Sequence, residues 1–223
     1  MKVCLVLYLL LALFSQALAQ SDSVAEAADI EFKEGIYIVF EQVKLNAPLE
    51  KSRVITKVGY NDPDFFDQVL SNKELSFYDD NGMKQRVPVK SVWGYAKNGD
   101  LYVGINNQYC KVSYLGSISH FIVTHFQTVY ESTYDPYYNS NPYYYPSAGI
   151  RYASPKTELR QFLINFENGQ VVDYTADNIM ALLTKDPQLY DEYAALKKKK
   201  REQLKFFYIR KFNQRNPLKI SSK

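Results

Sequence analysis

The sequence predicts an α+β fold, in which an antiparallel β meander or open barrel is followed by a carboxy-terminal helix pair. Three observations indicate this class. Asn-Gly or Asn-Asn pairs separate short apolar runs over much of the chain, and such pairs favour tight hairpin turns. Helix-start signals then follow at Thr175 and Asp186. Beyond Cys4 the chain has only one cysteine, Cys110, so we expect a stabilising core and no disulfide.

Residues 1–19 are typical of a signal peptide. Lys2 is positive, residues 3–14 are apolar, and Ala17-Leu18-Ala19 resembles a cleavage site. The apolar run is too short to span a bilayer. Cleavage near Ala19/Gln20 would leave a chain of about 200 residues without a transmembrane segment, which we expect to be periplasmic or secreted.

The stretch 87–126 predicts the central strands, over residues 92–97, 100–105 and 108–114. Two-residue turns fix their register, which places Cys110 opposite Val103. We expect an apolar face that includes Val92, Val103 and Cys110, with the thiol buried and inert. The opposite face would carry Trp93 and several tyrosines, with the Trp93 ring covering Gly104.

The remaining β domain, residues 35–174, follows a loose leader over residues 20–34. We expect strands over 35–40, 53–58 and 118–128, a short helix over 41–49, a helix that starts at Asp62, and hairpins over 75–79/83–89 and 159–166/170–174. Asp79-Asp80-Asn81-Gly82 resembles the start of a calcium loop, but Lys90 stands where an EF-hand needs glutamate. We interpret the segment as a turn.

Residues 175–215 predict the helices. Thr175 caps a helix over 176–184, and Asp186 caps a second one that begins with Pro187. The second helix would run to about residue 213, roughly 40 Å, and its distal half would lie across the β domain or project from it. Its expected core stripe consists of Leu189, Tyr193, Leu196, Leu204 and Phe207.

Three segments carry a family resemblance. They are GIYIVFEQVKLNAP, VWGYAKNG and ENGQVVDYTADNIMALLTKDPQLYDEYAALKKKKREQLKFFYIRKFNQRNPL. Together they are similar to a family of exported Bacteroidota proteins of unknown function. The resemblance implies an envelope or extracellular location and carries over no functional residue.

Charge is divided unequally along the chain. From Lys185 onward there are 12 basic and 4 acidic residues, a net charge of +8, whereas residues 20–184 have 14 basic and 20 acidic, a net charge of −6. The candidate binding residues of the basic helix are Lys197, Lys198, Lys199, Lys200, Arg201, Phe206, Phe207 and Tyr208. They suit an acidic envelope protein, anionic lipid or acidic polymer. The alternative is that they form a solvated collar that keeps the helix soluble, or that they pair with the acidic barrel of the same chain. Nucleic acid fits the charge but not an exported location.

A second candidate surface is the tyrosine-rich loop over residues 130–155, with eight tyrosines and four prolines. Tyrosine suits protein partners and sugar faces, so a glycan-binding protein is the alternative function. The candidate residues are Tyr137, Tyr138, Tyr143, Tyr144 and Tyr145. The alternative without a binding role is that the loop folds back on the barrel and shields a sheet edge.

Evidence for catalysis is thin. His120 and His125 are five residues apart in a predicted strand, so they lie on opposite faces and cannot jointly hold a metal through that strand. Serine-hydrolase, zincin, P-loop and dinucleotide motifs do not occur in the sequence. We therefore expect a non-enzymatic binding module without a metal or cofactor; an enzyme with an unrecognised site ranks third.

Overall fold

The computed structural model describes residues 30–132 and 151–220, and of residues 126–132 and 151–156 only the backbone. The main sheet has seven antiparallel strands in the order β1-β4-β5-β6-β7-β8-β9. Its strands are β1 (Gly35–Tyr37), β4 (Gly94–Lys97), β5 (Asp100–Ile105), β6 (Gln108–Tyr114), β7 (Ile118–Ser132), β8 (Arg151–Asn165) and β9 (Gln170–Asp173). From β4 to β9 each strand pairs with the next one in sequence, so the predicted meander is confirmed. The helices follow it, and the chain is α+β.

The central register is the predicted one. Val103 lies opposite both Gly94 on β4 and Cys110 on β6. Asn98 and Gly99 have φ values of 54° and 80° in the first turn, the left-handed conformation that such turns require. Cys110 is half-buried against the core, and its burial raises the pKa of the thiol.

The predicted faces around Trp93 are wrong. Val92 packs in the same cluster as Tyr95, Tyr102 and Tyr109. Trp93 packs on the opposite side against Phe40, with ring centroids 5.3 Å apart. The cause is that β4 begins only at Gly94, after the 3-10 turn η2 (Val89–Ser91), so strand alternation does not extend back to these residues. Gly104 is covered by its cross-strand partner Tyr109, not by Trp93.

The N-terminal elements differ from the prediction in extent. They are α2 (Phe40–Lys44), η1 (Lys51–Arg53), α3 (Phe65–Leu70), β2 (Glu74–Tyr78) and β3 (Lys84–Pro88). The strand predicted over 53–58 is wrong, since only Val54 forms a bridge there, to Phe77. Helix α3 starts later than predicted because Asp62 holds the preceding turn, its Oδ1 accepting a hydrogen bond from Asp64 N at 2.8 Å.

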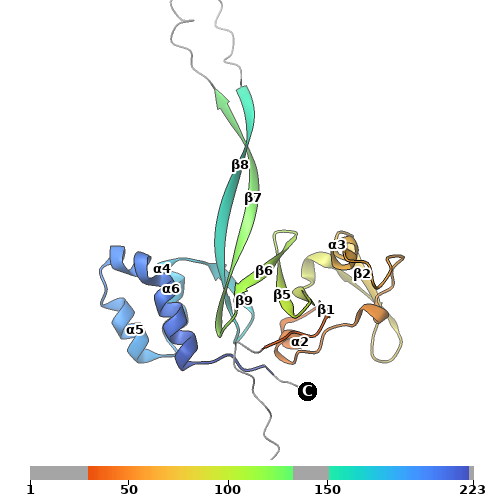
Figure 1. Cartoon of the computed structure of the whole chain (residues 1–223), viewed down its shortest axis with the longest axis horizontal. Coiled ribbons are helices and arrows are strands. Elements are labelled where there is room, and N and C mark those ends of the chain that lie inside the picture. Colours follow the sequence, from red (N-terminus) through yellow and green to blue (C-terminus); the bar gives the residue numbers. More distant parts are fainter. Residues whose placement is uncertain (1–29, 133–150, 221–223) are drawn as a thin grey trace, which may run out of the picture.

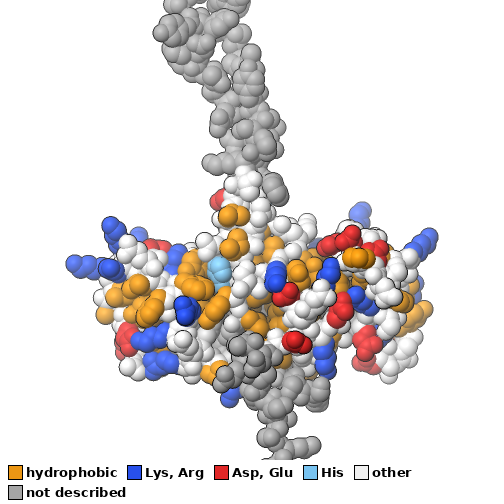
Figure 2. Space-filling model, viewed as in Figure 1, with side chains coloured by type: hydrophobic (Ala, Val, Ile, Leu, Met, Phe, Trp, Pro, Cys, Tyr) orange, Lys and Arg blue, Asp and Glu red, His pale blue; other side chains and the backbone are white. Residues whose placement is uncertain are grey.

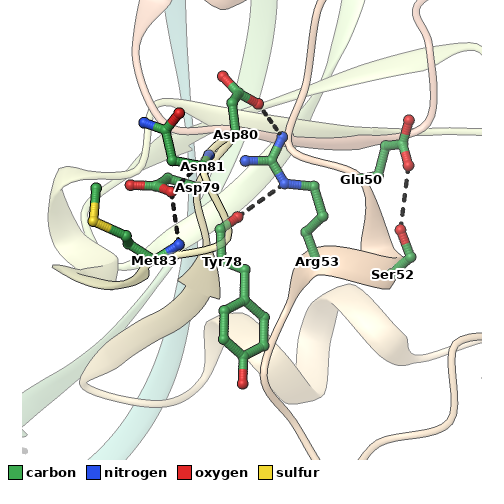
Figure 3. A network of polar contacts seen from close by, with 8 residues as sticks. All are labelled: Glu50, Ser52, Arg53, Tyr78, Asp79, Asp80, Asn81 and Met83. Carbon is green, nitrogen blue, oxygen red and sulfur yellow. Dashed lines mark hydrogen bonds and ion pairs between the residues drawn. The ribbon is translucent and has the colours of Figure 1, made fainter.

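The turn between β2 and β3 has the predicted form, and Figure 3 shows its polar contacts. Asp79 Oδ1 accepts hydrogen bonds from Asn81 N and Met83 N, both at 2.9 Å. Arg53 donates to Tyr78 O at 2.8 Å and pairs with Asp80 at 2.6 Å. The pKa of Asp79 is lowered, mainly by the hydrogen bond from the Gln85 side chain and then by those from backbone amides. This carboxylate therefore closes a turn.

The helices are α4 (Ala176–Leu183), α5 (Pro187–Ala194) and α6 (Lys198–Arg215). Both predicted caps are confirmed: Thr175 Oγ1 accepts from Asn178 N at 3.2 Å, and Asp186 Oδ1 accepts from Leu189 N at 3.2 Å. The single helix predicted to residue 213 is wrong, because the chain breaks between α5 and α6. Lys197 is extended there, with φ −62° and ψ 147°.

The break allows α6 to pack against both α4 and α5 (Figure 1). Tyr193 Oη spans it by donating to Arg201 O at 3.1 Å. It also resets the helical phase, so Tyr208, Ile209 and Phe212 face the core. Phe207, predicted in the core stripe, is 57% exposed.

The buried residues of the described chain form three clusters. One covers one face of the curled sheet with α2 and the C-terminal Leu218 and Ile220. A second joins the opposite face to α3 and the β2–β3 hairpin. The third packs α4, α5 and α6 on β7, β8 and β9. In Figure 1 the helices and the N-terminal elements accordingly lie on opposite sides of the sheet.

Asn213 of α6 fastens the helices to the sheet. Its Nδ2 donates to Ile118 O, and its Oδ1 accepts from Ile118 N, both at 2.8 Å and both buried. Gly116 lies against this amide: a Cβ there would stand 2.1 Å from Asn213 Nδ2. Glycine is therefore required here by close approach.

Strands β7 and β8 extend well beyond the rest of the sheet. They pair from Ile118 and Asn165 out to Ser132 and Arg151, about 50 Å at the usual rise, and project as a ribbon in Figure 1. They thus occupy both ends of the range in which we predicted a loop, 130–155. Residues 133–150, including the five candidate tyrosines, lie outside the described residues.

Candidate functional site

The five consecutive cations lie at the corner where α5 gives way to α6. Lys197 is the N-cap of α6, Lys198, Lys199 and Lys200 occupy its first turn, and Arg201 follows. We call these five residues the basic corner. The break in the helix gathers the five residues around the start of α6, instead of distributing them along a continuous helix. Figure 2 shows Lys and Arg side chains projecting at this end of the helical layer.

No described acidic residue pairs with the cations of the basic corner. Lys197 to Lys200 are exposed, and none of the five residues forms an ion pair within residues 30–132 and 151–220. Four other cations of the helical layer are paired. Lys205, Lys211 and Arg215 pair with Glu202, Glu192 and Asp186, and Lys185 pairs with Glu167. Arg210 and Lys219 also form no ion pair within the described residues, but five of the seven unpaired cations between Lys185 and residue 220 lie at this corner.

The start of α6 is an unfavourable place for these cations. No side chain caps this end, and its first turn holds no acidic residue. The helix dipole makes an N-terminus partially positive, so it favours anions and disfavours lysine. An anion bound here would relieve both the mutual repulsion and the dipole conflict.

Arg201 turns inward. It is half-buried, its Nη1 lies 3.6 Å from Met180 Sδ, and its Nε is buried without a hydrogen-bond partner within the described part of the chain. Its guanidinium thus joins α6 to α4, while the four lysines face solvent.

The predicted aromatic residues divide between core and surface. Tyr208 is buried, with its ring 4.8 Å from that of Tyr193. Phe207 is more than half exposed and follows Lys200 by seven residues, about two helical turns, so both lie on the same side of α6. Phe206 is 39% exposed and contacts the rings of Tyr114 and His120. Phe206 and Phe207 are the aromatic residues of this group that an incoming partner reaches.

Sequence reasoning missed a cluster beside Phe206. His120 Nε2 lies 3.0 Å from Gln161 Oε1, and the His120 ring packs edge-on against Tyr174. Lys205 Nζ sits 4.3 Å from the centre of the Tyr174 ring. No sequence signal predicts this cluster, because its members come from β7, β8, the connection after β9, and α6. Burial lowers the pKa of His120, an effect that the Gln161 contact opposes.

Other chemistry is not evident in the described residues. His125 is exposed and lies apart from His120 on the other face of β7. Residues 30–132 and 151–220 contain no group of three or more His, Cys, Asp or Glu side chains placed to hold a metal. Within the same ranges, no helix is both long and apolar enough to cross a bilayer.

Comparison of this chain with protein-family models, curated proteins and solved structures finds no match. The comparisons thus do not bear on the resemblance to exported Bacteroidota proteins, which stays a prediction. The candidate site rests on the geometry and charge described above.

Proposed function

We propose that this protein is an exported, non-enzymatic binding module of the cell envelope that contacts an acidic partner through the basic corner. One observation carries the proposal: within the described part of the chain, five adjacent cations stand without ion pairs at a helix N-terminus that no side chain caps. That arrangement costs the isolated chain stability. An acidic polypeptide or polymer supplies the missing negative charge, and Phe207 offers an exposed aromatic anchor on the side of Lys200.

The proposal is tested by exchanging charge at two exposed positions, Lys198→Glu and Lys199→Glu. Binding to poly-glutamate, measured by fluorescence anisotropy, should be lost. The melting temperature should rise at the same time, because glutamate is favourable in the first turn of a helix. If the lysines instead form only a solvated collar, the wild-type chain will not bind poly-glutamate at physiological salt.

Vesicles that contain phosphatidylglycerol distinguish a lipid surface from an acidic polypeptide. Stronger retention on these vesicles than on poly-glutamate would assign the basic corner to a membrane surface and overturn the choice of an acidic polypeptide or polymer. A matched control replaces Lys57 and Lys84 by glutamate; both are exposed, and neither forms an ion pair with another described residue. This control has the same net charge as the test variant and should retain binding.

A further inference from the structure

A cavity of about 530 Å³ lies on the other side of the molecule from the helices. Residues 70–73, 88–90 and 104–109 line it together with Val92. Its walls are tied together by Val89, whose N–H donates to Lys73 O at 3.0 Å and whose carbonyl accepts from Tyr109 Oη at 3.3 Å. The volume lies within the range of small-molecule sites.

The lining of this cavity is positively charged. Lys73 and Lys90 belong to it, and no aspartate or glutamate does. Neither lysine forms an ion pair or a side-chain hydrogen bond within residues 30–132 and 151–220. A second cavity, of about 620 Å³, contrasts with it, because there Arg53 is already paired with Asp80 and Asp79 is close by. The 530 Å³ cavity therefore favours a ligand with negative charge.

Amide side chains supply the polar part of the lining. Those of Asn106, Asn107 and Gln108 make no hydrogen bond within the described part of the chain, and Asn72 uses only its Nδ2, toward Gln68 O and Val69 O. An amide offers both donors and acceptors, and so does each hydroxyl of a sugar. Leu70 and Val92 add apolar surface, which suits the C–H groups of a sugar ring.

The turn at Asn106-Asn107 supports a role for its side chains. Both residues have positive φ, 50° and 61°. Three other hairpin turns of the described chain have a glycine at a position with positive φ, Gly82, Gly99 and Gly169, with φ from 75° to 80°. Glycine adopts this conformation without strain, and asparagine tolerates it better than most residues that carry a side chain. The hairpin beside the cavity thus keeps an amide where backbone geometry favours glycine.

We propose that this cavity binds an acidic sugar, a saccharide that carries a carboxylate. Lys73 and Lys90 would meet the carboxylate, and the amides of Asn72, Asn107 and Gln108 would meet the hydroxyls. The site is separate from the basic corner, so the failure of either proposal leaves the other intact.

The test is isothermal titration of the full chain with digalacturonate, beside a neutral digalactose and inorganic sulfate. Digalacturonate should bind, and the other two should bind at least about tenfold more weakly. Digalactose lacks the carboxylate, and sulfate lacks the sugar hydroxyls. Equal binding of sulfate would show a site for any anion and would overturn the assignment to a sugar, as would the absence of digalacturonate binding.

Variants separate recognition from folding. Asn107→Gly should keep or raise the melting temperature, because it relieves the positive φ, yet it should weaken digalacturonate binding severalfold. Lys73→Gln with Lys90→Gln should weaken it at least about tenfold. The control pair Lys57→Gln and Lys84→Gln, outside the cavity, should change nothing. Unaltered affinity in both cavity variants would refute the proposal.

Discussion

Replacing Asn213 by leucine should strongly destabilise the protein. Leucine has a similar size, but it leaves both Ile118 N–H and Ile118 C=O buried without the partner that Asn213 supplies. Each unsatisfied group costs about 1–3 kcal/mol, so the free energy of unfolding should fall by about 2–6 kcal/mol. For a chain of this size the melting temperature should drop by roughly 5–20 °C.

The assay is urea denaturation followed by circular dichroism, together with calorimetry. Gln214→Leu is the matched control, since Gln214 is the exposed neighbour on the same helix, and its effect should be small. A loss below about 1 kcal/mol in Asn213→Leu would refute the view that this amide docks the helices on the sheet.

Gly116 gives an independent test of the same contact. Gly116→Ala should destabilise the wild type because its Cβ meets Asn213 Nδ2. In the Asn213→Ala background this clash is absent, so Gly116→Ala should cost much less there. Equal costs in both backgrounds would place the clash elsewhere.

Three further predictions concern the core and the pH response. Gly169→Ala should lower the melting temperature, because Gly169 has φ +75° and a Cβ there would lie 2.3 Å from the Phe40 ring; calorimetry measures this. Tyr37→Phe should lower the free energy of unfolding modestly, by about 1–2 kcal/mol in urea denaturation, because it removes the hydroxyl that contacts Lys33 O and Asn46 Oδ1. The lowered pKa of His120 means that the folded chain binds this proton less readily than the unfolded chain does, so stability should fall as pH drops from about 7 toward about 5. His120→Gln should flatten that dependence, and an unchanged slope would contradict it.

Local signals predicted much of this fold. The Asn-Gly and Asn-Asn pairs fix hairpin positions and register because few residues adopt positive φ at low cost. Thr175 and Asp186 mark helix starts because a single side chain can satisfy the free amides there. In each case the chemistry lies within four residues of the structure that it determines.

Tertiary contacts decided the features that were missed. No proline or glycine marks the helix break at Lys197 in the sequence. The break forms because it allows α6 to bury Ile209 and Phe212 against the sheet. Trp93 and Val92 lie on the faces opposite to those predicted because the pairing of β4 with β1 and β5 begins only at Gly94.

The candidate sites were predictable to different degrees. The basic corner was visible as a run of charge, but its position at an uncapped helix start was not. The cavity beside Asn107 was not predictable, because its walls come from separate segments that only the fold brings together.

The central claim, that the basic corner binds an acidic partner, is tested most directly by the salt dependence of poly-glutamate binding. The comparison uses the wild type, the triple variant Lys198→Gln, Lys199→Gln and Lys200→Gln, and a control of equal net charge with Lys57, Lys84 and Lys219 changed to glutamine. Wild type and control should bind at low salt and lose affinity steeply as salt rises, whereas the triple variant should bind weakly with a shallow slope. Identical slopes for the triple variant and the control would contradict the proposal, because net charge and not the basic corner would then explain the binding.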